Sequence, residues 1–224
     1  MATIAHSGPS APGVVFHDAT WDDYETMLRL VGDRPIRVTY DQGTMEVFMP
    51  SFGHEDDAHL LGRMIETLTD LLDIPMKAGR TTIHKRRDLD RGTEPDQCYW
   101  LYDNARRMVG KRQLDLNTDP APDIVIEVDL TRSSLERLPL FAAMGVPEVW
   151  RLAGETLAFL HLQPDGSYQA HDWSRSFPAL TVADAARFLD LGRKEEENAW
   201  ARSFRTFVHD PIVPPPRERA NGAE

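Results

Sequence analysis

Residues 123–129 read DIVIEVD, and this stretch decides the fold class of the chain. Its β-branched residues predict a strand, which we expect to run from Ile124 to Leu130. A strand that is almost entirely aliphatic is typical of a central strand covered on both faces. Helical and strand patterns alternate around it, so we predict an α/β (α+β) fold in which a mixed central sheet is flanked by helices.

Hydrophobic periodicity and turn signals place the other elements. We expect helices near residues 20–31, 53–72, 134–144 and 195–208, and one more that Thr181 caps. We expect strands at residues 36–40, 44–49, 81–83, 97–102, 148–152, 156–162 and 168–173. The basic segment that follows residue 102 is expected to be irregular as far as Pro122. Pro139 requires either an irregular first turn or a helix that begins near it.

Length and composition bound the class of protein. The 224 residues suit one domain, which we place at residues 16–210 between a disordered N-terminal arm (1–15) and a disordered C-terminal tail (211–224). No apolar run approaches the roughly 18 residues that a membrane span needs, and the N-terminus lacks an apolar signal core, so we expect a cytoplasmic protein. The single Cys98 excludes an internal disulfide and a cysteine-rich zinc site.

Two acidic motifs stand beside apolar strands. Glu94-Pro95-Asp96 precedes the strand expected at residues 97–102, and Glu127 lies within DIVIEVD. Carboxylates on core strands are costly unless they are paired, hydrogen-bonded or bound to a cation. If Asp96 and Glu127 point the same way from neighbouring strands, they suit Mg²⁺ (or Mn²⁺), which binds oxygen ligands and needs only one or two carboxylates. Such an ion serves phosphodiester hydrolysis, whereas the alternative is a buried salt bridge to a flanking arginine.

The other two acids of DIVIEVD have different expected roles. Asp129 shares a strand face with Glu127, so it is either a third metal ligand or a base that activates water. Asp123 follows Pro122 and is expected to have the structural role of capping a turn.

Basic residues lie on both sides of the first acidic motif. They are Lys85, Arg86, Arg87 and Arg91 before it, and Arg106, Arg107, Lys111 and Arg112 after it. The net charge of −11 argues against polyanion binding by the whole surface but permits a local basic groove, although a solvated loop also explains either cluster. We predict that Arg86, Arg87 and Arg91 contact nucleic acid. His54 is predicted to bind a phosphate or orient a metal ligand, with a local hydrogen bond as the alternative.

Four segments, in this order, resemble the Uma-two family of restriction-endonuclease-like proteins: MPS at 49–51 with His54, EPDQ at 94–97, PDIVIEV at 122–128 and AAMGVPEVW at 142–150. The resemblance covers residues 20–189 and implies the PD-(D/E)XK nuclease fold with Mg²⁺-dependent strand cleavage. It matches Asp96 and Glu127 to the two acidic positions of that fold.

The sequence departs from this family pattern at two positions. Asp129 stands where the superfamily has lysine, and Thr39 stands where many members have glutamate. In this family a lysine in the next helix replaces the missing one, and Arg137 occupies that position here. An arginine can neutralise a phosphate, but its pKa is too high for it to act as a base.

Three functions are compatible with these residues. The first is a Mg²⁺-dependent DNA endonuclease, acting as a homodimer because duplex cleavage needs two sites, with catalytic residues Asp96, Glu127, Asp129 and Arg137. The second is a nucleic-acid-binding or regulatory protein that kept the nuclease fold and lost cleavage. The third is a protein-interaction module in which the acidic cluster is purely structural.

Overall fold

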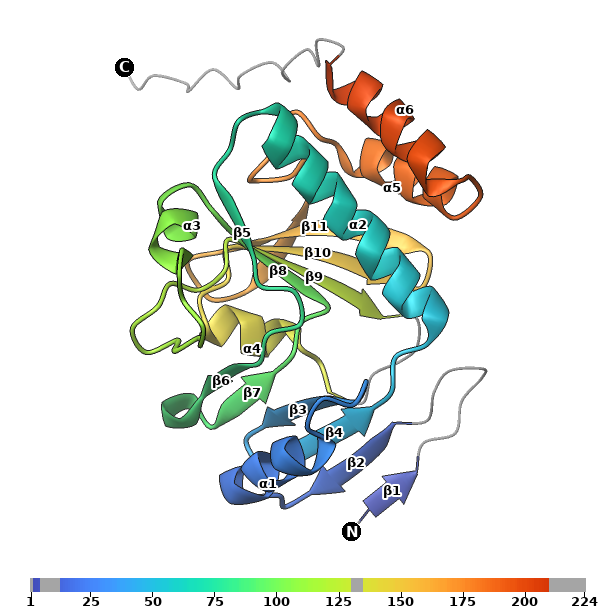
Figure 1. The fold of residues 1–224 in the computed structure, drawn as a ribbon. Helices are drawn as coiled ribbons and strands as arrows, with labels where there is room; N and C mark the ends of the chain where they lie inside the picture. Colours follow the sequence, from blue (N-terminus) through green and yellow to red (C-terminus); the bar gives the residue numbers. More distant parts are fainter. Residues whose placement is uncertain (1, 5–12, 130–134, 210–224) are drawn as a thin grey trace, which may run out of the picture.

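The computed structural model describes residues 2–4, 13–129 and 135–209. These residues form a mixed α+β fold with two six-stranded sheets (Figure 1). The first sheet has the order β1 (Ala2–Ile4), β2 (Val14–His17), β4 (Thr44–Phe48), β3 (Arg37–Asp41), β7 (Arg91–Thr93) and β6 (His84–Arg86). The second has the order β12 (Tyr168–His171), β11 (Thr156–Leu162), β10 (Glu148–Ala153), β9 (Ile124–Asp129), β8 (Gln97–Leu101) and β5 (Met76–Ala78).

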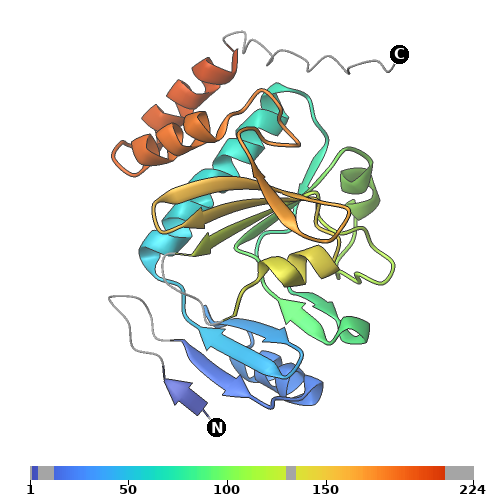
Figure 2. The ribbon, with the colours of Figure 1, turned by 180° about the vertical axis from the view of Figure 1, so that it is seen from behind.

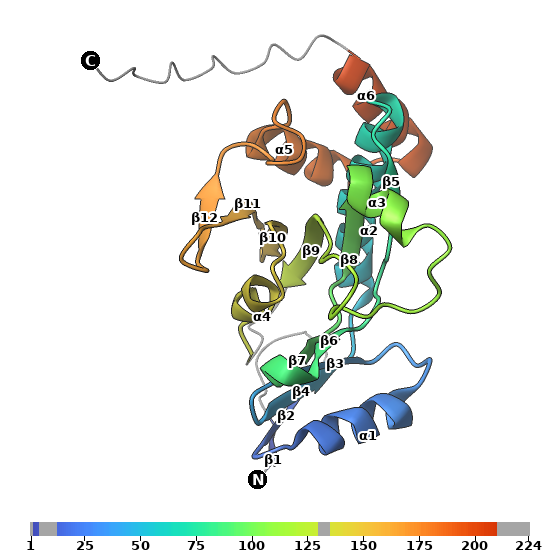
Figure 3. The ribbon, with the colours of Figure 1, turned by 90° about the vertical axis from the view of Figure 1, so that its left-hand side faces the viewer.

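The described helices are α1 (Trp21–Val31), α2 (Phe52–Leu71), α3 (Tyr102–Met108), α4 (Leu138–Ala143), α5 (Val182–Gly192), α6 (Glu197–His209) and the short 3₁₀ helix η1 (Arg87–Leu89). Figure 3 shows the first sheet lying between α1 and the second sheet. The side chains of Tyr24, Val38, Tyr40 and Met45 form a small core where α1 packs on that first sheet.

The second sheet is the predicted mixed sheet. Its strand β9 pairs parallel with β10 and antiparallel with β8, and its residues 124–128 are all buried. Helices α2, α5 and α6 cover one face and α3 and α4 the other, as the two opposite views show (Figures 1 and 2). The prediction of a mixed sheet flanked by helices is therefore confirmed. The first sheet, which holds the hairpin of β3 and β4, was not anticipated as a separate layer.

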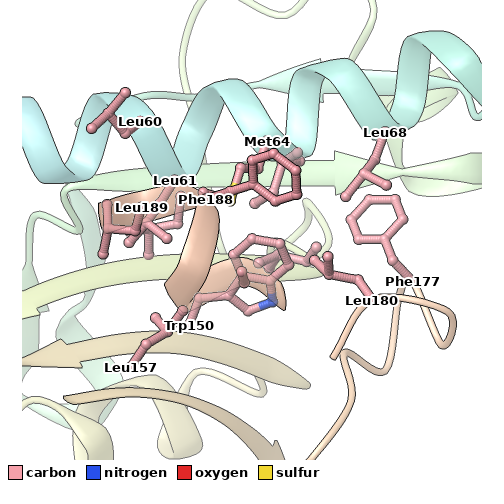
Figure 4. Packing of buried hydrophobic residues seen from close by; sticks show 14 of the residues in the cluster. Leu60, Leu61, Met64, Leu68, Trp150, Leu157, Phe177, Leu180, Phe188 and Leu189 are labelled. Atoms are coloured by element: carbon pink, nitrogen blue, oxygen red, sulfur yellow. The ribbon is translucent and has the colours of Figure 1, made fainter. Parts of the chain in front are cut away.

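The main core lies between α2 and the second sheet (Figure 4). The apolar stripe of α2 supplies Leu60, Leu61, Met64 and Leu68, which pack with Trp150 of β10. Removing a large buried aromatic side chain of this kind costs about 3–5 kcal/mol. This core fixes the position of α2 against β8 and β9, and therefore fixes its first turn beside the ends of those strands.

Two local predictions are wrong. Residues 81–83 form no strand, because the hydroxyl of Thr82 donates to Gly79 O and holds a local turn between β5 and β6. The segment expected to be irregular begins with helix α3. Asp123 holds the start of that helix, since it accepts hydrogen bonds from Leu101 N at 2.7 Å and Asn104 Nδ2 at 3.0 Å. Asp123 thus has a structural role, as expected. It holds the start of a helix about twenty residues earlier in the chain, however, and not a turn next to Pro122.

The ends of the chain and one internal helix differ from expectation in detail. Residues Ala2–Ile4, placed in the disordered arm, form β1 and pair antiparallel with β2. The tail expected at 211–224 lies outside the described residues, as does the expected helix start at residue 134. The described helix α4 begins at Leu138 with Pro139 in its first turn, which fits the second of the two alternatives. No described helix combines the length and the apolar composition needed to cross a membrane.

Candidate active site

Asp96 and Glu127 come together where β8 begins and β9 ends. The antiparallel register pairs Gln97 with Ile126, so the next step of the same register sets Asp96 opposite Glu127. Asp96 Oδ2 accepts a hydrogen bond from Val128 N at 2.8 Å, which extends the contact between the two strands. Both side chains belong to buried residues, only 3% and 1% exposed. The structure therefore brings the two predicted metal ligands side by side.

Arg137 occupies the space beside these carboxylates, just before α4. Its Nη1 donates to Glu127 Oε1, its Nη2 lies 3.5 Å from Glu46 Oε2, and its Nε donates to Thr39 Oγ1 at 3.3 Å. The guanidinium also stacks 4.7 Å from the centre of the Phe48 ring. Each guanidinium nitrogen of Arg137 thus has a partner in the protein. The buried salt bridge considered as an alternative therefore exists, at Oε1 of Glu127.

The second oxygen of Glu127 is different. Oε2 is buried and has no hydrogen-bond partner among the described residues. Burial raises the pKa of Glu127; Arg137 opposes the rise, whereas the negative charges of Asp96 and Asp129 add to it. One guanidinium therefore does not balance the carboxylates gathered here. A buried carboxylate oxygen without a donor, opposite a second carboxylate, fits a divalent cation.

The donor set matches a Mg²⁺ site with few protein ligands. Within residues 2–4, 13–129 and 135–209, no three His, Cys, Asp or Glu side chains are grouped to hold a metal. Asp96 and Glu127 would therefore be the protein's contribution. Mg²⁺ commonly retains several waters and is held by one or two carboxylates, so this set is sufficient for it.

His54 supports Asp96 rather than facing solvent. The Ser51 side chain caps α2 by accepting from His54 N at 3.3 Å, which places His54 in the first turn. Its Nε2 lies 3.3 Å from Asp96 Oδ2, an ion-pair contact without hydrogen-bond geometry. Burial lowers the pKa of His54, but Asp96, Glu127 and Glu55 outweigh burial and leave the pKa raised. The residue is 6% exposed and lies against Asp96, a position suited to orienting that carboxylate.

The remaining predicted site residues have acidic or basic partners elsewhere. Asp129 accepts from Arg151 Nε at 2.9 Å, so that carboxylate already has a cationic partner. The three arginines predicted to contact nucleic acid are also paired: Arg86 with Asp88 at 2.6 Å, Arg87 with Asp22 at 3.8 Å and Arg91 with Asp41 at 2.8 Å. Acids of β3, η1 and α1 thus lie beside arginines that look unpaired in the sequence.

One acid near the site was missed by sequence reasoning. Glu46 of β4 is 4% exposed and pairs in register with Thr39, the position where a family glutamate is lacking. The carboxylate of Glu46 thus comes from β4, the strand next to Thr39. An acid between the apolar residues Met45 and Val47 was the sequence signal that could have identified it. Glu94 has Arg37 Nη1 3.7 Å from its Oε2, and burial raises the pKa of Glu94 to about 7.

The mixed sheet between helices has the restriction-endonuclease-like fold. The chain belongs to the Uma2 family, whose description is "Putative restriction endonuclease" and whose family model matches residues 21–189. A crystal structure from Anabaena variabilis, described as a "putative nuclease belonging to DUF820", is similar with a TM-score of 0.53 and 17% identity, covering 76% of this chain and 99% of that one. Curated proteins provide no match.

Proposed function

We propose that this chain is a Mg²⁺-dependent endonuclease that hydrolyses phosphodiester bonds of DNA. The observation that carries the proposal is the opposed pair Asp96 and Glu127, in which the buried Oε2 of Glu127 has no hydrogen-bond partner among the described residues. The family description and the description of the similar crystal structure both support a nuclease. We also propose that the protein acts as a homodimer, since cutting both strands of a duplex needs two such sites. We propose a cytoplasmic location as well.

Each residue of the site has a distinct task in this proposal. Asp96 and Glu127 would hold Mg²⁺ (or Mn²⁺), and when bound the ion polarises a phosphoryl oxygen and makes water a better nucleophile. His54 holds Asp96 from the first turn of α2. Arg137 fixes Glu127 and joins it to Glu46 of the first sheet. The site therefore depends on both sheets, because its positioning groups come from each.

The test is nicking of supercoiled plasmid by the purified full chain. We expect relaxed circles in Mg²⁺ or Mn²⁺ and none in EDTA. We also expect Mn²⁺ to raise the melting temperature, because an ion at about 100 times its Kd stabilises the native state by about 2.7 kcal/mol. An unchanged melting temperature together with intact plasmid would reject the metal site and the nuclease proposal.

One observation favours a second candidate function, a nucleic-acid-binding protein without cleavage. Arg137 stands where the family pattern has lysine, and it is tied to Glu127 in a buried ion pair. A lysine there would present a compact charge with three rotatable donors in place of a planar fork, and it would release part of the contact with Glu46.

Arg137→Lys distinguishes the two candidates in the same nicking assay. If the proposed function is right, the native chain cleaves and the variant changes the rate without creating a new activity. Nicking by Arg137→Lys in Mg²⁺, with none by the native chain, would establish the native protein as the non-cleaving form.

A further inference from the structure

A second group of basic side chains has properties that the predicted arginines lack. Lys77 of β5 and Arg112, four residues beyond α3, are exposed, and neither forms an ion pair within the part of the chain that the structure describes. Arg86, Arg87 and Arg91, in contrast, each have a carboxylate partner. Free cations are the ones available to a ligand, because a paired cation must first give up its partner.

Lys77 and Arg112 line the same small cavity, together with a third basic residue, Lys111. The cavity measures about 140 Å³, and its basic lining residues are Lys77, Lys111 and Arg112. The Nζ of Lys111 lies 2.6 Å from Asp119 Oδ1, so one of the three charges is compensated. We call these three residues the basic patch. Figure 1 shows its setting, where α3 lies beside β5 at the edge of the second sheet.

The size and charge of the cavity indicate the kind of group that it accepts. Pockets that enclose a drug-sized ligand measure roughly 300–1,000 Å³, so a cavity of 140 Å³ suits one small group rather than a whole nucleotide. Lysine and arginine donors are typical binders of phosphate oxygens. In a chain with a net charge of −11, a local excess of free cations is well suited to a polyanion that avoids the rest of the surface.

The basic patch and the candidate active site lie near opposite ends of β8 (Gln97–Leu101). Lys77 pairs in register with Trp100 of β8, which also lines the cavity. Asp96 lies just before β8, and the four residues from Asp96 to Trp100 span about 14 Å of extended chain. DNA carries one phosphate per about 3.4 Å of axis on each strand, so this distance corresponds to about four phosphates.

We propose that Lys77 and Arg112, beside the paired Lys111, bind the phosphate backbone of duplex DNA about four nucleotides from the bond at Asp96 and Glu127. The choice of DNA rests on the proposed function, whereas binding at the basic patch does not require cleavage. The contact is to the backbone, so it is insensitive to base sequence and steeply dependent on salt.

The experiment measures binding of a fluorescent DNA duplex to the full chain in EDTA over a series of salt concentrations. The double variant Lys77→Gln/Arg112→Gln removes two phosphate contacts. It should reduce the slope of log Kobs against log salt by about 1.8, because each contact contributes about 0.9. The loss should be equal for duplexes of unrelated sequence.

A matched control removes the same charge elsewhere. Lys194 and Arg202 are exposed, and their side chains have no ion-pair partner within the described ranges. They lie in the region of α5 and α6, over the opposite face of the second sheet (Figure 1). Lys194→Gln/Arg202→Gln should keep the native slope.

The outcomes separate this inference from the proposed function. A reduced slope in the Lys77/Arg112 variant supports the basic patch even if the native chain never nicks DNA in Mg²⁺, a result that would reject only the nuclease. A native slope in that variant, an equal loss in the Lys194/Arg202 control, or no binding by the native chain would overturn the inference. Tighter binding of an RNA duplex of equal length would overturn the choice of DNA.

Discussion

Replacing Arg137 with methionine is expected to lower the free energy of unfolding by about 3–5 kcal/mol. The substitution keeps a similar apolar volume but leaves Glu127 buried without its guanidinium partner. Breaking one side of a buried ion pair costs more than the pair contributes, because the remaining charge has neither water nor a partner. Urea unfolding followed by circular dichroism measures the change, provided that the slope of the transition is unchanged.

An exposed arginine provides the control for this measurement. Arg205 lies 3.4 Å from Asp70, and its side chain is 50% exposed, so Arg205→Met should cost no more than about 1 kcal/mol. Adding Glu127→Gln to Arg137→Met removes the buried charge of Glu127 and should recover part of the loss. Equal effects of Arg137→Met and Arg205→Met would contradict the buried ion network between the two sheets.

The sequence was sufficient for those parts of the fold that depend on local pattern. Four of the six residues of β9 are aliphatic, and α2 carries a continuous apolar stripe, so each element is specified by its own residues. Helix α3 could not be read in this way. Its start is held by Asp123, about twenty residues later in the chain, and its own sequence has no capping side chain.

The same distinction applies to the candidate site. Asp96 and Glu127 could be identified because an acid beside a buried strand needs a partner, and one register brings the two strands together. The contribution of Glu46 and the capture of Arg137 depend on how the first sheet packs against the second. Such contacts between layers leave no periodic signal. The sequence therefore carried no sign that the carboxylates of Glu46 and Glu127 surround Arg137, the residue expected to neutralise a phosphate.

Asp96→Asn is expected to reduce metal-dependent nicking by more than about 100-fold. Loss of a residue that only supports a metal ligand typically costs about 10–100-fold, and Asp96 is a proposed ligand itself. Asparagine keeps an oxygen that can accept from Val128 N, so the contact between β8 and β9 survives and the fold should be retained. Nicking rates in Mg²⁺ measure the effect, and the response of the melting temperature to Mn²⁺ reports metal binding without reference to activity.

The exposed Asp88 supplies the matched substitution. Its side chain is 53% exposed and pairs with Arg86 on the surface, so Asp88→Asn should leave both the nicking rate and the Mn²⁺ response as in the native chain. Native nicking by a folded Asp96→Asn variant would remove Asp96 from the catalytic machinery. A lost Mn²⁺ response in Asp96→Asn but not in Asp88→Asn would tie ion binding to the strand pair β8 and β9. That result would support a cation at Oε2 of Glu127, which is buried and has no hydrogen-bond partner among the described residues.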